Sequence, residues 1–201
     1  MAGKLTIEIY KEKNASDLTA AIAAPECKAN GGSAAAYTAA LGCALLERVA
    51  RICAGADETN ERLAYLVRNS EILRTYMVHL IDEDVKAKGP INRARKEGGE
   101  REIEASIQTA SCIDAEIVNM MKNALEFALE LSACCPAEDR HFLLESAELC
   151  MASCRAAQSA LFAYADLSTD ETYRFVTHRE NEIFLEERQA LYDQIVGAIR
   201  G

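Results

Sequence analysis

A long and regular spacing of apolar residues constrains the fold of this chain more than any other feature. From Ile103 to Leu131, apolar residues recur at alternating steps of three and four positions, and Asp114 falls on the same stripe. This spacing places side chains on one face of a helix that packs in a bundle. Runs of β-branched residues, which mark strands, are nearly absent. The sequence therefore predicts an all-α fold, a multihelical up-and-down bundle of five to six helices.

Five further helices are predicted from the same spacing and from capping residues. They cover about residues 17–24, 33–53, 60–84, 143–161 and 171–195. Ser33 is the predicted N-cap of the second helix, and Ser168 with Glu171 forms a predicted capping box before the last. Between residues 86 and 100, four punctuating residues including Pro90 predict a loop or a broken helix.

A thin stripe of small residues between Leu143 and Leu161 predicts close packing against a neighbouring helix, in this chain or in a partner subunit. No internal repeat or linker divides the sequence. We therefore expect one domain over residues 1–201.

The charge and the apolar stretches exclude several classes of protein. The net charge of −10 argues against a general nucleic-acid binder, because neutralising phosphates requires a basic face. The first residues, MAGKLTIEIYKEKN, lack the apolar core of a signal peptide, and no later apolar stretch is long enough to span a bilayer. We expect a soluble cytoplasmic protein, in which any bound anion meets a local basic site.

The eight cysteines lie mostly within helical patterns, which predicts reduced thiols rather than a disulfide scaffold. Cys150 and Cys154 share a helical face, but no CxxC motif occurs and the three histidines are scattered. We therefore expect small core residues here and no metal site.

The segment KANGGSAAA, from Lys28, is the first candidate site. Glycines let the backbone approach a ligand closely, and the helix that follows presents free N–H groups and a positive dipole end. The pattern fits an anionic or carbonyl-bearing ligand, but the same residues can simply start a helix. No P-loop lysine follows, so a nucleoside triphosphate is not indicated.

The segment LIDEDVKAK, from Leu80, places carboxylates beside lysines and is the second candidate. Such pairs act as general acids and bases where a cleft removes water, whereas a solvated helix end has the same composition. The basic residues from Lys86 to Arg101 could hold ligand carboxylates or could form an exposed loop. Asp114 needs a partner if it is buried, and the commoner outcome is a wet position at the edge of the stripe.

These two segments resemble a known family. GGSAAAYTAALGCALLERVARIC resembles the signature of the formiminotetrahydrofolate cyclodeaminase and methenyltetrahydrofolate cyclohydrolase family, approximately PGGGSAAALAGALGAALVAMVARLT. LIDEDVKAK resembles the family's LIDEDAEAF. Helix order and length agree over most of the chain.

The resemblance implies a helical homodimer that acts on a tetrahydrofolate derivative, with no metal and no redox cofactor. In one family reaction N10 attacks a formimino carbon and ammonia leaves; in the other, water opens the methenyl ring. A helical homodimer of the same fold that has lost catalysis, and binds a folate-like ligand or a protein, is the alternative. The residues matched to roles are Asp84 and Asp82 as catalytic carboxylates, Asn30, Gly31, Gly32 and Ser33 around the substrate, and Lys88 and Arg93 on its glutamate tail.

The sequence departs from the family pattern at several places, including Arg48 and Cys53 where the family has methionine and threonine. Ala29 and Asn30 replace a proline and a glycine, so Asn30 is expected to supply any unusual φ angle in the turn. Near the C-terminus, Phe162 and Asp166 stand among residues where the family has asparagines.

Overall fold

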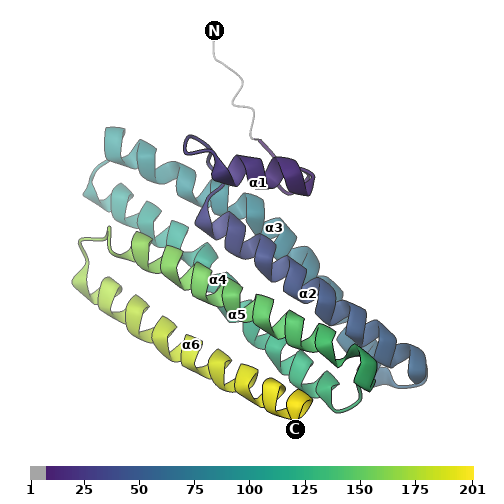
Figure 1. Ribbon diagram of the computed structural model, residues 1–201. Helices are drawn as coiled ribbons and strands as arrows, with labels where there is room; N and C mark the ends of the chain where they lie inside the picture. The colour runs from purple at the N-terminus through teal and green to yellow at the C-terminus, as the bar shows by residue number, and fades with distance from the viewer. Residues whose placement is uncertain (1–7) are drawn as a thin grey trace.

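Six α-helices account for most of the part of the chain that the computed structural model describes, residues 8–201 (Figure 1). They are α1 (Ala15–Ala23), α2 (Gly31–Ala56), α3 (Glu61–Glu97), α4 (Glu100–Ser132), α5 (Arg140–Ala165) and α6 (Glu171–Arg200). A short 3₁₀ helix, Ala137–Asp139, leads into α5. The predicted all-α bundle of five to six helices is confirmed.

Short connections make the long helices α2 to α6 run up and down beside one another (Figure 1). α2 packs mainly against α3 and α5, while α4 packs against α3, α5 and α6. The short α1 lies over the bundle near the start of α2 (Figure 1). The start of α2 is therefore enclosed by other helices, and this position is where the candidate site forms.

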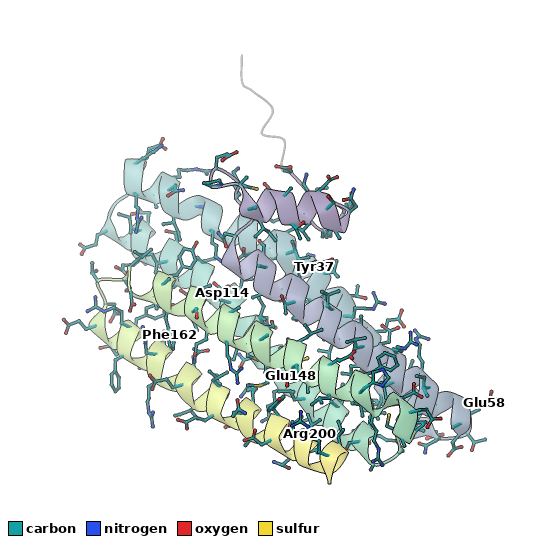
Figure 2. The ribbon with its side chains drawn as sticks, viewed as in Figure 1. Tyr37, Glu58, Asp114, Glu148, Phe162 and Arg200 are labelled. Carbon is teal, nitrogen blue, oxygen red and sulfur yellow. The ribbon has the colours of Figure 1, made fainter. Side chains whose placement is uncertain are left out.

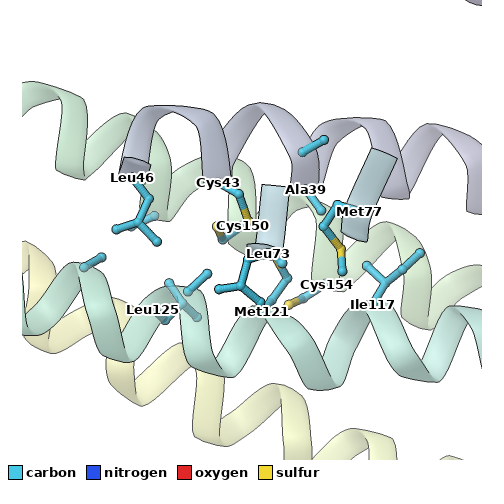
Figure 3. Close-up of a cluster of buried hydrophobic side chains, with 14 of the residues drawn as sticks. Ala39, Cys43, Leu46, Leu73, Met77, Ile117, Met121, Leu125, Cys150 and Cys154 are labelled. Atoms are coloured by element: carbon cyan, nitrogen blue, oxygen red, sulfur yellow. The ribbon is translucent and has the colours of Figure 1, made fainter. Parts of the chain in front are cut away.

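The core fills the space between α2, α3, α4 and α5 (Figure 3). Every member of the predicted α4 stripe from Ile107 to Leu131 is buried. Leu46 of α2, Met77 of α3 and Met121 of α4 are among the largest fully buried side chains. The bundle is thus held mainly by removing these apolar faces from water.

The contact between α2 and α5 is close, as the thin stripe of small residues predicts. The Ser146 hydroxyl donates a hydrogen bond to the Gly42 carbonyl at 2.8 Å, and the Ser153 hydroxyl donates to the Ala35 carbonyl at 2.8 Å. A Cβ atom added to Gly42 would lie 2.9 Å from the Cys150 Sγ and 3.2 Å from the Cys150 backbone nitrogen. Small residues are therefore required where these two backbones approach.

The sequence predicts a loop or a broken helix over residues 86–100; a loop is wrong for most of this range, because α3 continues through Pro90 to Glu97 and the helix breaks only at Gly98 and Gly99. Val85, Lys88 and Ile91 are all buried, so the buried face keeps its helical spacing across the proline. Tertiary packing here outweighs the loss of one backbone donor. Only Gly98 and Gly99 separate α3 from α4.

The caps of α2 and α6 also differ from the prediction. Asn30 is the N-cap of α2, and Ser33 lies inside the first turn. Asp170 caps α6 by accepting a hydrogen bond from the Tyr173 N–H at 3.0 Å. Ser168 instead donates its hydroxyl to a Glu104 carboxylate oxygen, so the predicted capping box does not form. Both helices begin close to their predicted positions but use a different residue as the cap.

All eight cysteines are free thiols, as predicted. None of the described helices combines the length and the apolar composition needed to cross a membrane. The prediction that the chain lacks a signal peptide rests partly on residues 1–7. These residues lie outside the part of the chain that the structure describes.

Two glycines within α2 test the close packing against α5. Gly42→Ala is expected to lower the free energy of unfolding by about 1–3 kcal/mol, because the added methyl group collides with Cys150. Gly55→Ala, in the same helix but facing open space, is the matched control and is expected to raise it by about 0.5–1 kcal/mol. Urea unfolding measures both, and equal effects would contradict the proposed contact.

Candidate acid–base site

A buried lysine joins two buried aspartates where α2, α3 and α4 meet. The Lys88 ammonium forms an ion pair with Asp84 Oδ1 one turn earlier on α3, and its Nζ lies 3.3 Å from Asp114 Oδ2 on α4. Both aspartates are fully buried, and Lys88 is 8% exposed. Figure 2 shows Asp114 among the helices of the bundle. These three residues are called the Lys88 cluster below.

The first turn of α2 packs directly onto the Lys88 cluster. A Cβ atom at Gly32 would lie 2.5 Å from Asp114 Oδ1 and 2.5 Å from Lys88 Nζ, and it would also collide with Asp84. Gly32 is therefore needed for close approach and not for an unusual backbone angle, since no described residue has a positive φ. Next to it, the Ser33 hydroxyl donates a hydrogen bond to Asp84 Oδ2 at 2.8 Å.

Asn30 and Tyr164 border the cluster. Asn30 Oδ1 accepts a hydrogen bond from the Gly32 N–H at 3.2 Å and from Lys88 Nζ at 3.4 Å. Its φ of −145° and ψ of −152° are extended, so the expected unusual φ is not present. Lys88 Nζ also lies 4.7 Å from the centre of the Tyr164 ring of α5, a cation–π contact.

Tyr164 is not among the site residues predicted from the sequence. It lies three positions after Leu161, so it continues the thin stripe of α5 as an aromatic residue among small ones. That continuation is the signal that could have indicated it.

Burial and the neighbouring charges compete in setting the pKa of each group in the cluster. Burial prevails at Asp114, and the neighbouring charges prevail at Lys88. Burial raises the pKa of Asp114 to about 7, with Lys88 opposing this rise and Asp84 adding to it. Burial disfavours the Lys88 ammonium, but attraction to Asp114 and Asp84 outweighs it and the pKa of Lys88 is raised. Lys88 is therefore an ammonium at neutral pH, while Asp114 exchanges a proton near neutrality.

Apart from the Lys88 ammonium, 3.3 Å from its Oδ2, Asp114 has no polar partner in the cluster. Neither of its oxygens accepts a hydrogen bond from residues 8–201, although both are buried. Buried polar atoms normally have a partner, and one that lacks it marks a place where a ligand or a water donates. The expectation that Asp114 lies wet at the edge of its stripe is wrong, because its side chain is fully buried.

The structure does not bring every expected site residue into the cluster. Asp82 accepts hydrogen bonds from the backbone N–H groups of Tyr10 and Lys11, at 2.7 Å and 3.3 Å, and so anchors the segment before α1. Gly31 is exposed and has open space where a Cβ would be. Arg93 is exposed on α3, five residues beyond Lys88.

The departures near the C-terminus fall in the corner between α5 and α6. The ring of Phe162 stacks on His178 with the centroids 3.9 Å apart, and His178 Nε2 lies 2.8 Å from Asp166 Oδ1. Phe162 is labelled at this corner in Figure 2. These residues form a local contact of their own, separate from the Lys88 cluster.

The fold and the site together define a helical bundle with a buried lysine–dicarboxylate centre at a helix start. A sequence model described as formiminotransferase-cyclodeaminase matches residues 14–166, so the chain belongs to this family. All the residues of the Lys88 cluster and its border lie within the matched range.

The fold is also similar to a solved structure. The crystal structure of formiminotetrahydrofolate cyclodeaminase from Thermotoga maritima aligns with a TM-score of 0.88 and 20% sequence identity, over 95% of this chain and 98% of that chain. A search of curated proteins gives no significant match.

Two adjacent glycines test the close approach of α2 to the cluster. Gly32→Ala is expected to lower the free energy of unfolding by about 1–3 kcal/mol, because the new methyl group displaces buried charges. Gly31→Ala is the matched control, and its methyl group meets nothing, so the stability is expected to stay the same or rise by about 0.4–1 kcal/mol. Chemical unfolding measures the stability of both variants. A Gly32→Ala variant as stable as Gly31→Ala would contradict the close approach of α2 to the cluster.

Proposed function

We propose that this protein is an enzyme of folate one-carbon metabolism, a formiminotetrahydrofolate cyclodeaminase or a methenyltetrahydrofolate cyclohydrolase. The family assignment over residues 14–166 supports the substrate class. The observation that carries the proposal is Asp114, a buried carboxyl with a pKa of about 7 whose nearest polar partner is the Lys88 ammonium, 3.3 Å from its Oδ2. Such a group can take up and return a proton at neutral pH.

In the cyclodeaminase reaction, Asp114 would move one proton between two nitrogens. The formimino group enters in its protonated form, N5–CH=NH2+. N10 attacks the formimino carbon and forms the new carbon–nitrogen bond, and the ionised Asp114 takes the proton that N10 loses. The protonated Asp114 then returns it to the formimino nitrogen. The bond from carbon to that nitrogen breaks, ammonia leaves, and the methenyl bridge forms. A carboxyl that titrates near the working pH serves both transfers.

Asp84 and Lys88 would set the charge around this step. With both aspartates ionised, the cluster carries one net negative charge, opposite in sign to the methenyl cation. Asp84 is held in a fixed position in a dry site by the Lys88 ammonium and by the Ser33 hydroxyl. The same arrangement would serve the cyclohydrolase reaction, in which water adds to the methenyl carbon. Neither reaction changes an oxidation state, so the proposal includes no redox cofactor; as the resemblance implies, it also includes no metal.

The start of α2 would hold the reacting end of the folate, beside Asn30, Gly31, Gly32 and Ser33. Lys88 already contacts two carboxylates, so we assign it to the chemistry rather than to the glutamate tail. Arg93, exposed on the same helix, stays available for the tail carboxylates.

The proposal includes the homodimer that the resemblance implies. Light scattering that gave the mass of a single 22.0 kDa chain would remove that part of it.

The variant Asp84→Asn tests the proposed chemistry. Purified protein is expected to release ammonia from formiminotetrahydrofolate as the methenyl chromophore appears, or to remove that chromophore from methenyltetrahydrofolate. Asp84→Asn keeps the shape but removes the fixed charge, so turnover is expected to fall by about 10²–10⁴-fold.

Asp193→Asn, which changes an exposed aspartate of α6, is the matched control and is expected to keep full activity. Equal turnover by the two variants would overturn the role of Asp84. No turnover of either folate by the wild-type protein would favour the non-catalytic alternative.

A further inference from the structure

A second polar feature lies far from the Lys88 cluster. A depression of about 520 Å³ opens between α2 and α3, and it is lined by Ala44, Glu47, Arg48, Arg51, Ile52 and Arg74. This volume is within the range of small-molecule sites. Arg48 follows Gly32 by sixteen positions on α2, which is about 24 Å along a helix. The depression is therefore separate from the proposed folate chemistry.

A nearly buried glutamate organises two of the arginines. Glu47 is 7% exposed, and its Oε1 accepts hydrogen bonds from Arg51 Nε at 2.9 Å and Nη2 at 2.6 Å. Its Oε2 accepts a hydrogen bond from Arg74 Nε at 2.6 Å. Arg74 uses only this nitrogen, and its two Nη groups have no partner among residues 8–201. Glu47 thus fixes two guanidinium groups while leaving donors free.

The third arginine is fixed by an aromatic ring. The Arg48 guanidinium lies 4.5 Å from the centre of the Phe142 ring of α5. Arg62 has the same arrangement on Tyr65, at 4.6 Å, but its guanidinium fork is filled by Glu130 through bonds of 2.8 Å and 2.7 Å. No carboxylate of the described chain pairs with Arg48. The two arginines therefore differ in one respect. Glu130 fills the guanidinium fork of Arg62, whereas the fork of Arg48 is free to bind an acidic group.

The charge of the depression is opposite to that of the chain. Three arginines and one glutamate give the lining a net charge of +2, in a protein whose net charge is −10. Glu71 lies 3.4 Å from Arg51 outside the lining and reduces this excess without removing it. A local basic site is the place where an acidic protein can hold an anion.

We propose that the depression binds a small molecule that carries two neighbouring acidic groups, carboxylates or phosphates. One acidic group pairs with the free fork of Arg48, and the other meets the free donors of Arg74 and Arg51. Ala44 and Ile52 contact the apolar part of the molecule between them. Planar, bidentate recognition of this kind is characteristic of arginine.

Isothermal titration calorimetry of the full chain with inorganic pyrophosphate and, separately, with glutarate tests the site. Saturable binding of one molecule per chain is expected for at least one probe, and the probe that binds more tightly identifies phosphate or carboxylate as the preferred group. Arg48→Gln is expected to weaken that binding at least tenfold, because it removes the free fork from an exposed position without disturbing Glu47.

Two further variants complete the test. Arg48→Lys, which keeps the charge but not the fork, is expected to fall between the wild type and Arg48→Gln. Arg62→Gln is the matched control, since it also removes an arginine stacked on an aromatic ring, and it is expected to bind like the wild type. Absence of saturable binding by the wild type, or equal losses in Arg48→Gln and Arg62→Gln, would overturn the proposal. Neither result bears on the folate chemistry.

Discussion

The arrangement of the start of α2 depends on the buried ammonium of Lys88. Removing a charged group from water costs far more than one hydrogen bond returns, unless an opposite charge is close. Asp84 and Asp114 supply that opposite charge from α3 and α4. Burial raises the pKa of Asp114 to about 7, with Asp84 adding to the rise and Lys88 opposing it, so Asp114 holds a proton near neutrality. The electrostatic arrangement that makes burial tolerable is thus the same one that provides a proton for chemistry.

The backbone adapts to this cluster at two places. Gly32 lets the first turn of α2 reach the buried charges without a side chain in the way. α3 stays helical through Pro90, so that the buried face which carries Lys88 extends to Ile91. A break at residue 86, as local sequence signals suggest, would remove the lysine from its position opposite Asp114.

The sequence predicts the fold well because the fold depends on repeated spacing. The α4 stripe and the small residues of α5 each identify a packed face without knowledge of its partner. The caps and Pro90 are predicted less well, since local preferences there are outweighed by contacts from other helices. Asp114 was singled out by its position on an apolar stripe, but its burial and its pairing with Lys88 depend on how α3 meets α4.

Function is predictable from the sequence mainly where one segment carries it. The residues Asn30 to Ser33 and the segment around Asp84 are each continuous, and the structure brings both to one point. Tyr164 comes to the Lys88 cluster from α5, and the arginine depression joins Arg74 of α3 to residues 44–52 of α2, so neither is revealed by one segment alone. Asp82 shows that proximity in sequence can also mislead. It lies two residues before Asp84, but its side chain accepts a hydrogen bond from the backbone of Tyr10.

Titration of the Asp114 carboxyl by carbon-13 NMR is the most direct measurement of whether this cluster holds an exchangeable proton. The signal can be assigned as the resonance that Asp114→Asn removes from protein labelled at the aspartate side-chain carboxyls. A midpoint at about pH 7 is expected, with the group protonated below it and ionised above it. A midpoint near 4, as for an ordinary aspartate, would contradict the proposal that Asp114 transfers protons at neutral pH.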